Sequence, residues 1–494
     1  MKREVFRMER VTYKEKEVTL LEDFNLQIYS GEILGLLPVN AYGMSSFLKL
    51  LQTNLPLYGG YVYYGGEKVN SWKESRRTSN RISIIGADSR LVESLSVSDN
   101  IFVLRQGFGQ EIIRTALLKR QLAPFLADIG MDIPVDARVG ELSAFERVVV
   151  ELLRAIAMGN RLIVLNEIGT IISYEELGKL HRIMHHYTEQ GFSFLYICLH
   201  YEEISMVCDR TAMLSNGHIQ KMIQPGDAAE EITHRCSAEY DRMVRGHLEN
   251  RKKAVLEKKE ILRFSHLCGE SMQNLTFSVY EGECLVIQML GNSIFREMRE
   301  LLLGNWKPES GEILMDGKRM KFPESSQAAV IQELPTRSMV FPELSYMENL
   351  CISLSMRVPS IWRKRGIRNS IRQEYGPVLG EEVFSLSVEE LSEKQKYQMV
   401  YTRILLQKPQ VVFCIQPFKG ADMPHRMVVW EMIEMLLNRG ISVVILSLNL
   451  ADSLSLADRL LVLKGREGME EILREDFASI HAAAPWLYLY QDED

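Results

Sequence analysis

Hydrophobic and polar positions along the chain follow two alternating patterns. Residues 3–30 alternate apolar and polar side chains, as a pair of β-strands does. Beyond them, short apolar runs such as Ile33–Leu37 are separated by segments in which apolar residues recur at helical spacing. Strands that alternate with helices in this way predict a mainly parallel sheet with crossover connections.

The first 220 residues can be divided into successive elements by this pattern. A helix is predicted to begin near Ser143, with Glu146 three residues later as its capping-box partner. The other predicted elements are a helix that opens at Ser45 and Ser46, a Gly-rich hairpin at 57–69, a strand at 82–85, a helical insert within 99–140, strands at 161–167, 193–200 and 210–217, and a helix to about residue 190. Ligands of such sheets bind at the carboxyl ends of the strands.

The second half of the chain repeats the first. The segment 31–51 begins Gly-Glu and continues as an apolar strand and a helix, and the segment 282–304 does the same. Further matches, each separated by 249 or 251 residues, are Gly60 and Gly311, Gly66 and Gly317, Leu95-Ser96 and Leu344-Ser345, Asn100 and Asn349, Leu142-Ser143 and Leu391-Ser392, and Asp209-Arg210 and Asp458-Arg459. A series of matches held in order indicates an internal duplication. We therefore predict domains at 1–240 and 261–494, joined by a charged connection at 241–260.

Composition narrows the class of protein. The chain has 494 residues, 46% of them hydrophobic and 25% charged, which is typical of a globular protein. The net charge is −7 and no long basic run occurs, so nucleic acid is not expected as the main partner. We expect no secretion and no membrane span, because the N-terminus has no apolar signal region and no run of 18 apolar residues occurs.

The seven cysteines show no spacing typical of a metal site. They are Cys198, Cys208, Cys236, Cys268, Cys284, Cys351 and Cys414, mostly in apolar surroundings. We interpret them as buried free thiols in a reducing compartment.

The turn after Ile33–Leu37 is laid out like a phosphate-binding loop, but its residues depart from the usual pattern. That loop reads Gly-x-x-x-x-Gly-Lys-Ser/Thr and surrounds a phosphate with backbone N–H groups at a helix N-terminus. Here Pro38 replaces the first Gly and Met44 the Lys, while Gly43 and Ser45 fit. Taken alone, the segment is also compatible with an ordinary strand-to-helix turn.

The order of these elements resembles the ATP-binding cassette ATPases, in particular the tandem-cassette subunits of bacterial simple-sugar importers of the ribose and galactose type. The resemblance covers nearly the whole chain, including the segment MVRGHLEN at 243–250. It implies an α/β fold with two tandem P-loop-type domains, each a mainly parallel sheet with an antiparallel β subdomain and a helical insert. It also implies ATP and Mg²⁺ as cofactors, a membrane permease and a possible second cassette subunit as partners, and a cytoplasmic location at the inner face of the membrane.

The resemblance also assigns roles to residues of the first half. In the family, the loop Lys pairs with phosphates, Ser/Thr and Asp hold Mg²⁺, and an adjacent Glu orients water. The matching positions here are Tyr13 against adenine; Asn40, Gly43, Met44, Ser45 and Ser46, with Ser392 from the other half, around the nucleotide; Ser45 and Asn166 at the metal; and Glu167 and His200 for catalysis. Asn166 replaces the Asp, and Ala87 replaces a Gln that contacts the metal. Taken singly, Tyr13 and His200 could be packing residues, and Glu167 could be a charge at the start of a helix.

The second half departs further from the family pattern. Ile294, Phe295 and Arg296 occupy the Gly-Lys-Ser/Thr positions, and Ile415-Gln416 replaces Asp-Glu, so we predict a closed site. Gly420 and Asp422 persist after it and suit either a turn or a dimer contact. The signature Leu-Ser-Gly-Gly-Gln appears as residues 142–146 and 391–395, where Ser143 and Ser392 could simply cap helices.

Two hypotheses about function follow. The first is a hydrolysis-impaired energy-coupling subunit of a sugar-type importer with weak or vestigial nucleotide binding. The second is a non-catalytic scaffold or regulatory module, and the soluble tandem cassettes that act on ribosomes are a weaker third possibility.

In the family, a permease helix docks near the segments that correspond to Asp88–Asn100 and Leu334–Asn349. The Leu-Ser…Asn frame kept there could serve docking, or could only pack the insert onto the sheet.

Overall fold

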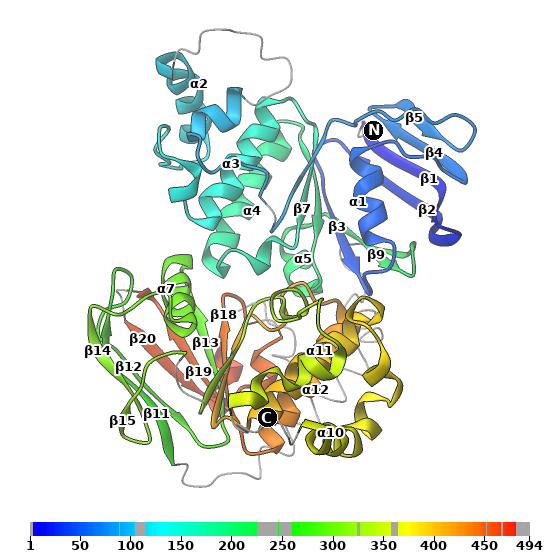
Figure 1. Cartoon of the computed structure of the whole chain (residues 1–494). Helices are drawn as coiled ribbons and strands as arrows, with labels where there is room; N and C mark the ends of the chain where they lie inside the picture. Colours follow the sequence, from blue (N-terminus) through cyan, green and yellow to red (C-terminus); the bar gives the residue numbers. More distant parts are fainter. Residues whose placement is uncertain are drawn as a thin grey trace. The chain divides into compact units, whose positions relative to one another are not determined.

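The computed structural model describes residues 3–87, 89–103, 115–224, 246, 259–323, 327–356, 364–450, 452–465 and 468–480. The chain divides into two compact units, Met1–Ser237 and Ala238–Asp494 (Figure 1). The predicted connection at 241–260 lies almost wholly outside the described residues, as does the tail at 481–494.

The first unit begins with an antiparallel sheet in the order β2-β1-β4-β5. Its strands are β1 (Glu4–Glu15), β2 (Val18–Tyr29), β4 (Gly59–Tyr64) and β5 (Glu67–Ser71). The alternation in residues 3–30 arises because one face of this sheet packs on the core and the other faces solvent. In Figure 1 this sheet lies on one side of helix α1 (Met44–Gln52).

The second sheet of this unit is mainly parallel, in the order β10-β9-β3-β8-β7-β6. Only β10 runs antiparallel to its neighbour. The strands are β3 (Ile33–Pro38), β6 (Ile82–Ile85), β7 (Leu162–Asn166), β8 (Ser193–Ile197), β9 (Arg210–Ser215) and β10 (His218–Ile223). The helices are α2 (Thr115–Asp128), α3 (Ala144–Ala157), α4 (Tyr174–Glu189) and α5 (Tyr201–Val207). The sheet and helix order confirms the predicted fold class.

The central strand β3 is buried on both faces. Ile33 and Leu37 pack into the core formed with the helices, whereas Leu34 and Leu36 pack into the core shared with the antiparallel sheet and α1. At Gly35, between them, a Cβ atom would lie 2.5 Å from Ile204 Cγ2. The continuous apolar run therefore reflects a strand covered on both sides.

The second unit repeats this plan (Figure 1). Its antiparallel sheet has the order β12-β11-β14-β15 and its mainly parallel sheet the order β16-β17-β18-β13-β19-β20. The strands are β11 (Glu260–Cys268), β12 (Leu275–Tyr280), β13 (Cys284–Met289), β14 (Ser310–Met315), β15 (Lys318–Arg319), β16 (Ala328–Ile331), β17 (Val411–Ile415), β18 (Ser442–Ser447), β19 (Arg459–Leu463) and β20 (Met469–Leu473). The helices are α7 (Asn292–Leu303), α8 (Pro335–Ser338), α9 (Tyr346–Cys351), α10 (Lys364–Leu379), α11 (Glu393–Gln407) and α12 (Met423–Asn438).

The duplicated Asp-Arg pairs have a structural role in both units. Asp209 accepts a hydrogen bond from Ile33 N at 2.8 Å, and Arg210 pairs with the buried Glu32 at 3.0 Å. In the second unit Asp458 accepts one from Cys284 N at 2.9 Å, and Arg459 pairs with Glu283 at 2.9 Å. In each unit these contacts join the start of the central strand to the neighbouring strand. The matched Asp-Arg pairs therefore have the same structural role.

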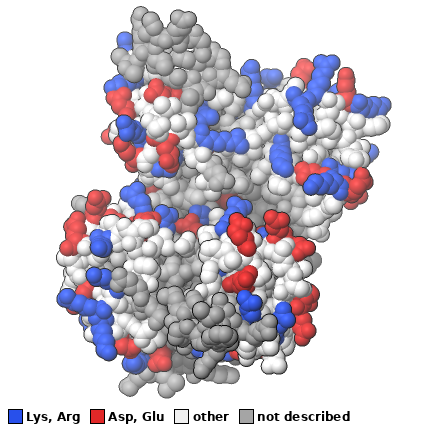
Figure 2. All heavy atoms as spheres, viewed as in Figure 1, with Lys and Arg blue, Asp and Glu red and all other residues white. Residues whose placement is uncertain are grey.

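The remaining expectations concern thiols, membrane and surface charge. Among the described cysteines, none of which forms a disulfide, three are buried and Cys208, Cys268 and Cys351 are half-buried, so the prediction of buried thiols holds only in part; Cys236 lies outside the described residues. Within the described part of the chain, no helix is long and apolar enough to cross a membrane. Cationic and anionic side chains are interspersed on the face shown in Figure 2.

Candidate nucleotide site

The loop between β3 and α1, residues 39–43, lies at the carboxyl edge of the parallel sheet of the first unit. It ends at Gly43, which has a φ of +78° and serves as the N-cap of α1. A Cβ atom at Gly43 would lie 2.3 Å from Leu20 O and 3.0 Å from Leu21 Cδ2. Only glycine fits this left-handed position, so Gly43 keeps the geometry with which a phosphate loop passes into a helix.

The substituted side chains of this loop hold it to the rest of the unit. Asn40 Nδ2 donates to Asn216 Oδ1 at 2.9 Å, and Asn40 Oδ1 accepts from Asn216 N and from Tyr42 N, each at 3.2 Å. Tyr42 Oη donates to Thr19 O at 2.6 Å. The amide predicted to contact nucleotide is therefore occupied by the β9–β10 turn.

The first turn of α1 carries the three residues that would meet the phosphates. Met44 is half-buried against the core beneath the antiparallel sheet, Ser45 is exposed, and Ser46 is buried with no hydrogen-bond partner for Oγ within the described residues. The first N–H groups of a helix have no intrahelical acceptor, so this turn offers donors to an anion. The Lys charge is absent, and Lys49 lies 3.4 Å from Glu15 instead.

Tyr13 belongs to β1 and lies in the core rather than on the surface. Its side chain is 8% exposed, and its hydroxyl donates to Glu15 Oε1 at 3.1 Å. Burial, together with the hydrogen bond to Glu15, raises the pKa of this phenol. The geometry favours the packing role for the ring, and the adenine contact stays a prediction.

The ends of β7 and β8 bring the catalytic positions to the same edge as the loop. Asn166 pairs with Ile197 in the parallel register, and Leu36 pairs with Ile197 from the other side. The chain therefore places the loop, Asn166-Glu167 and His200 at neighbouring strand ends, as the strand order predicts.

Asn166 and Glu167 differ in what they offer a ligand. Asn166 Oδ1 is buried without a hydrogen-bond partner within the described residues. Glu167 has a left-handed φ of 53° and its N–H donates to Ile197 O at 2.9 Å. An unpartnered amide oxygen is compatible with a metal ligand, but Asn166 and Ser45 supply only neutral oxygens, and Mg²⁺ in such sites is usually bound through carboxylates. The residues present fit Mg²⁺ weakly.

His200 is the N-cap residue of α5. Its N–H donates to Cys198 Sγ at 3.4 Å, and its carbonyl accepts from Ile204 N at 3.2 Å. These contacts give His200 a part in starting the helix, which is the structural role left open by the sequence.

A buried polar network behind this edge was not anticipated. Tyr196 Oη donates to Glu203 Oε1 at 2.5 Å and lies 3.3 Å from His181 Nε2. Burial lowers the pKa of His181 to about 4 and raises that of Tyr196 well above its usual value. Glu203 Oε2 would lie 2.6 Å from a Cβ atom at Gly169, two residues after Glu167. The sequence gives no signal for this network, because packing of α4 and α5 on β8 brings together residues that are far apart or of different elements.

The matching edge of the second unit is closed. Helix α7 begins at Asn292, whereas the residue matched to the start of α1 is Phe295, so the connection after β13 is only residues 290 and 291. Ile294 and Phe295 are buried, at 3% and 6% exposure. A loop this short cannot surround a phosphate. This geometry agrees with the predicted closed site.

The strand end in the second unit is also occupied by protein groups. Gln416 has a φ of 42° and is 8% exposed, and its Oε1 has no partner within the described residues. Lys419 Nζ lies 2.6 Å from Glu333 Oε2. Gln416 N donates to Leu446 O at 2.9 Å, as Glu167 N does to Ile197 O, so the backbone is retained while the chemistry has changed.

The signature segments cap their helices. Ser143 and Glu146 form a capping box at α3, and Ser392 forms one with Gln395 at α11. Phe145 is 5% exposed and packs into the core. The capping interpretation is confirmed for both serines, and a nucleotide contact of Ser392 stays a prediction.

The Leu-Ser…Asn frames hold their own loops. Asn100 is fully buried; its Oδ1 accepts from Val92 N at 2.8 Å, and its Nδ2 donates to Val92 O at 3.1 Å and Ser96 O at 3.0 Å. Asn349 makes the same three bonds to Phe341 and Ser345. These bonds close each loop on itself, and docking of a permease helix stays a prediction; Asp88, at the start of the first frame, lies outside the described residues.

Comparisons with known proteins agree with this architecture. A family model described as ABC transporter matches residues 21–169. The ribose import ATP-binding protein RbsA of Caldanaerobacter subterraneus is 25% identical, covering 96% of this chain and 97% of its own. The xylose import ATP-binding protein XylG of Shigella flexneri is 24% identical, covering 92% of each. The structure of RNase-L Inhibitor has a TM-score of 0.56 at 13% identity, covering 94% of this chain and 89% of its own, which shows the fold alone. The chain therefore resembles ABC transporter proteins over residues 21–169, and over most of its length it resembles ribose and xylose import ATP-binding proteins.

Proposed function

We propose that the chain is the ATP-binding-cassette subunit of a sugar-type import system, with weak nucleotide binding in its first half and little hydrolysis. The ribose and xylose import names of its relatives support the transport role. The proposed setting is the cytoplasmic face of a membrane, where the chain docks on a permease and a second cassette subunit supplies turnover.

The observation that carries this proposal is the difference between the two loops. The first unit keeps residues 39–43 between strand and helix, ending at the left-handed Gly43, whereas the second unit keeps only residues 290 and 291. The first loop retains helix N–H donors for an anion, and the second has converted the corresponding residues into helix. Any nucleotide should therefore bind to the first unit.

The magnitude of the losses argues against ordinary turnover. Removing one aligned electrostatic donor from a transition state costs about 3–4 kcal/mol, or about 10²–10³ in rate. The first unit lacks the loop Lys, the metal-binding Asp and the Gln at the same time, at Met44, Asn166 and Ala87. The rate losses from these three changes are not additive. Even part of their sum would lower the rate of ATP hydrolysis far below ordinary turnover.

The test is phosphate release by the purified full-length chain at saturating Mg-ATP. We expect a rate near the buffer blank. A rate of about 1 s⁻¹ or faster, in the usual enzyme range, would overturn the hydrolysis claim. A cassette ATPase with an intact Lys and Asp, purified in parallel, is the positive control.

The permease role is tested by co-purification from solubilised membranes. The exposed Arg90 and Arg337, one in each predicted docking segment, are the probes for charge reversal. Loss of the membrane partner in Arg90→Glu or Arg337→Glu, with unchanged thermal unfolding, supports docking. A protein that remains without a membrane partner contradicts it.

A scaffold or regulatory module is the second candidate, and the closed second unit favours it. The Lys419–Glu333 ion pair stabilises that edge without a ligand. Absence of nucleotide binding, together with absence of a membrane partner, would support this candidate in place of the transport role.

A further inference from the structure

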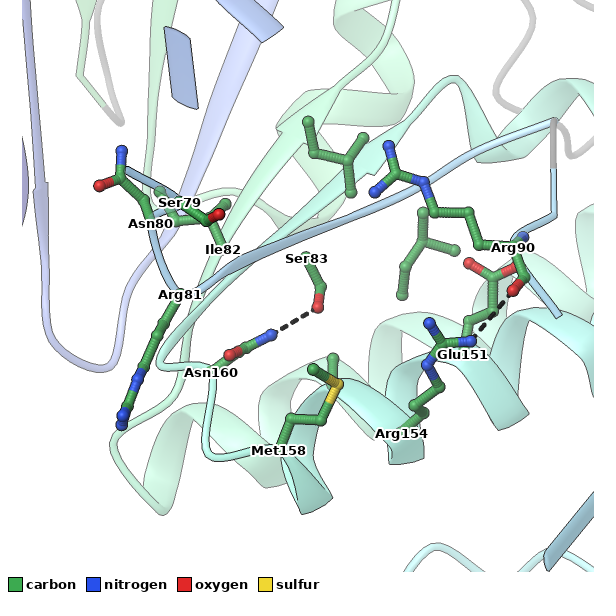
Figure 3. Close-up of a pocket in the computed structure, with 13 residues that line it drawn as sticks. Ser79, Asn80, Arg81, Ile82, Ser83, Arg90, Glu151, Arg154, Met158 and Asn160 are labelled. Carbon is green, nitrogen blue, oxygen red and sulfur yellow. Dashed lines mark hydrogen bonds between the residues drawn. The ribbon is translucent and has the colours of Figure 1, made fainter. Parts of the chain in front are cut away.

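A cavity opens at the edge strand β6 of the first unit, against helix α3 (Figure 3). Its volume is about 270 Å³. It is lined by Ser79, Asn80, Arg81, Ile82, Ser83, Ile84, Ile85, Arg90, Glu151, Arg154, Ala155, Met158 and Asn160. None of these residues belongs to the candidate nucleotide site.

One end of the cavity has a fixed polar frame. Glu151 is 8% exposed, and its Oε1 accepts from Ser89 Oγ at 2.5 Å and from Arg90 N at 2.9 Å. Arg154 Nη1 donates to Arg90 O at 3.0 Å, as Figure 3 shows. Both backbone polar groups of Arg90 are therefore held by side chains of α3, and the cavity wall has one defined position.

Positive charge dominates the lining. Arg90 and Arg154 contribute two guanidinium groups against the single carboxylate of Glu151, whereas the side chain of Arg81 points away from both in Figure 3. Within the part of the chain that the structure describes, neither Arg90 nor Arg154 makes a salt bridge, and Arg90 Nη2 bonds only the neutral Gln52 Oε1, at 3.0 Å. Guanidinium groups pair well with phosphate because their N–H groups match its oxygens in geometry.

The other end of the cavity is neutral. Asn160, which is 5% exposed, donates through Nδ2 to Ser83 Oγ at 2.7 Å. Figure 3 shows this pair apart from Arg90 and Arg154, with Met158 nearby. Amide and hydroxyl groups there can bond the hydroxyls of a ligand whose charged end faces the arginines.

The second unit shows that the fold does not require this polar frame. The residues matched to Arg154, Arg90 and Glu151 are Arg403, Met339 and Val400. Arg403 Nη1 still donates to Met339 O, at 2.7 Å, but Val400 is fully buried and apolar. The shared hydrogen bond is structural, whereas the carboxylate and the second arginine are particular to the first unit.

We propose that this cavity binds a small phosphate-bearing polyol, of the size and chemistry of a sugar monophosphate. Arg90 and Arg154 bind the phosphate, and Asn160 and Ser83 bind hydroxyl groups. The volume lies just below the range usual for small-molecule pockets, about 300–1,000 Å³, and suits a ligand of this size.

Isothermal titration of the purified full-length chain tests the proposal with three probes at constant ionic strength: a pentose 5-phosphate, the uncharged pentose and inorganic phosphate. We expect saturable binding of the sugar phosphate, weaker binding of phosphate and none of the pentose. Loss of a hydrogen bond to a charged group costs about 1.5–3 kcal/mol, so Arg90→Met and Arg154→Met should each weaken binding about tenfold or more. Glu151→Gln keeps an acceptor for Ser89 and removes a like charge, so it should strengthen binding.

Matched variants separate this cavity from other anion sites. Arg182→Met, an exposed arginine of α4 outside the cavity, should leave binding unchanged, and thermal unfolding confirms that each variant is folded. Ser45→Glu should also leave it unchanged; if it abolishes binding, the anion sits at the nucleotide loop and the proposal is wrong. Binding that Arg154→Met and Glu151→Gln do not alter, or no saturable binding at 10 mM (roughly 2.7 kcal/mol of affinity), likewise overturns it. Cavity variants that lose only a membrane partner would assign these arginines to protein docking instead.

Discussion

Replacing Asn100 with alanine should remove the side chain that closes the loop before the first helical insert. Asn100 is fully buried, and its amide pairs with Val92 N and O and with Ser96 O. Alanine leaves one N–H group and two carbonyls without these partners. A buried polar group left unsatisfied costs about 1–3 kcal/mol, and partial entry of water recovers some of it. We expect the free energy of unfolding to fall by about 3 kcal/mol.

The matched change in the second unit should cost more. Asn349 makes equivalent bonds to its loop, and its Oδ1 also accepts from Arg403 Nη2 at 3.2 Å. Arg403 is 4% exposed, and burial lowers its pKa to about 10. Asn349→Ala therefore weakens the contacts of a desolvated cation as well, and we expect a loss of about 4 kcal/mol.

Urea unfolding followed by circular dichroism measures both changes, with hydrogen exchange to assign each transition to a unit. Asn438→Ala, an exposed change at the end of α12, is the control and should shift stability by less than about 0.5 kcal/mol. If Asn100→Ala leaves stability within that range but abolishes association with a membrane partner, the frame serves docking and the packing account is refuted.

Three further predictions concern the first unit. Burial lowers the pKa of His181 from 6.5 to about 4, so protonation of this side chain opposes folding. The free energy of unfolding should therefore fall by up to about 3 kcal/mol between pH 6.5 and pH 4. Urea unfolding measured across this pH range should show a weaker dependence of that free energy on pH for His181→Gln. Gly43→Ala places Cβ against Leu20 O in a left-handed conformation and should lower the unfolding free energy by at least about 1–2 kcal/mol, measured by denaturant midpoint. Met44→Lys combined with Asn166→Asp should strengthen binding of a fluorescent ATP analogue in the presence of Mg²⁺ before it restores phosphate release; no gain in affinity would contradict the assignment of these positions.

The fold could be predicted because local pattern and duplication agree. Alternation in residues 3–30 and the doubly buried run at β3 each reflect a single packing environment. The capping boxes at Ser143 and Ser392 lie within four residues of sequence, so they were visible without any knowledge of tertiary contacts. The repeated Asp-Arg pairs marked a shared contact even though its partners were unknown.

The site was less predictable because its decisive contacts are distant in sequence or depend on where a helix starts. Asn40 is paired with Asn216, 176 residues away, and His181 meets Tyr196 across a layer boundary. The early start of α7 follows from burial of Ile294 and Phe295, which a short apolar run does not reveal. The sequence therefore identified which positions had changed, and the structure shows what replaced their chemistry.

The central claim, that only the first loop retains nucleotide binding and that it lacks turnover, is tested by titrating the full-length chain with a fluorescent ATP analogue, with and without Mg²⁺. Ser45→Glu and Arg296→Glu place a carboxylate at matched exposed positions of the two loops. We predict weak saturable binding that Ser45→Glu abolishes and Arg296→Glu leaves unchanged, with little dependence on Mg²⁺. Binding that Arg296→Glu abolishes and Ser45→Glu spares would contradict the account.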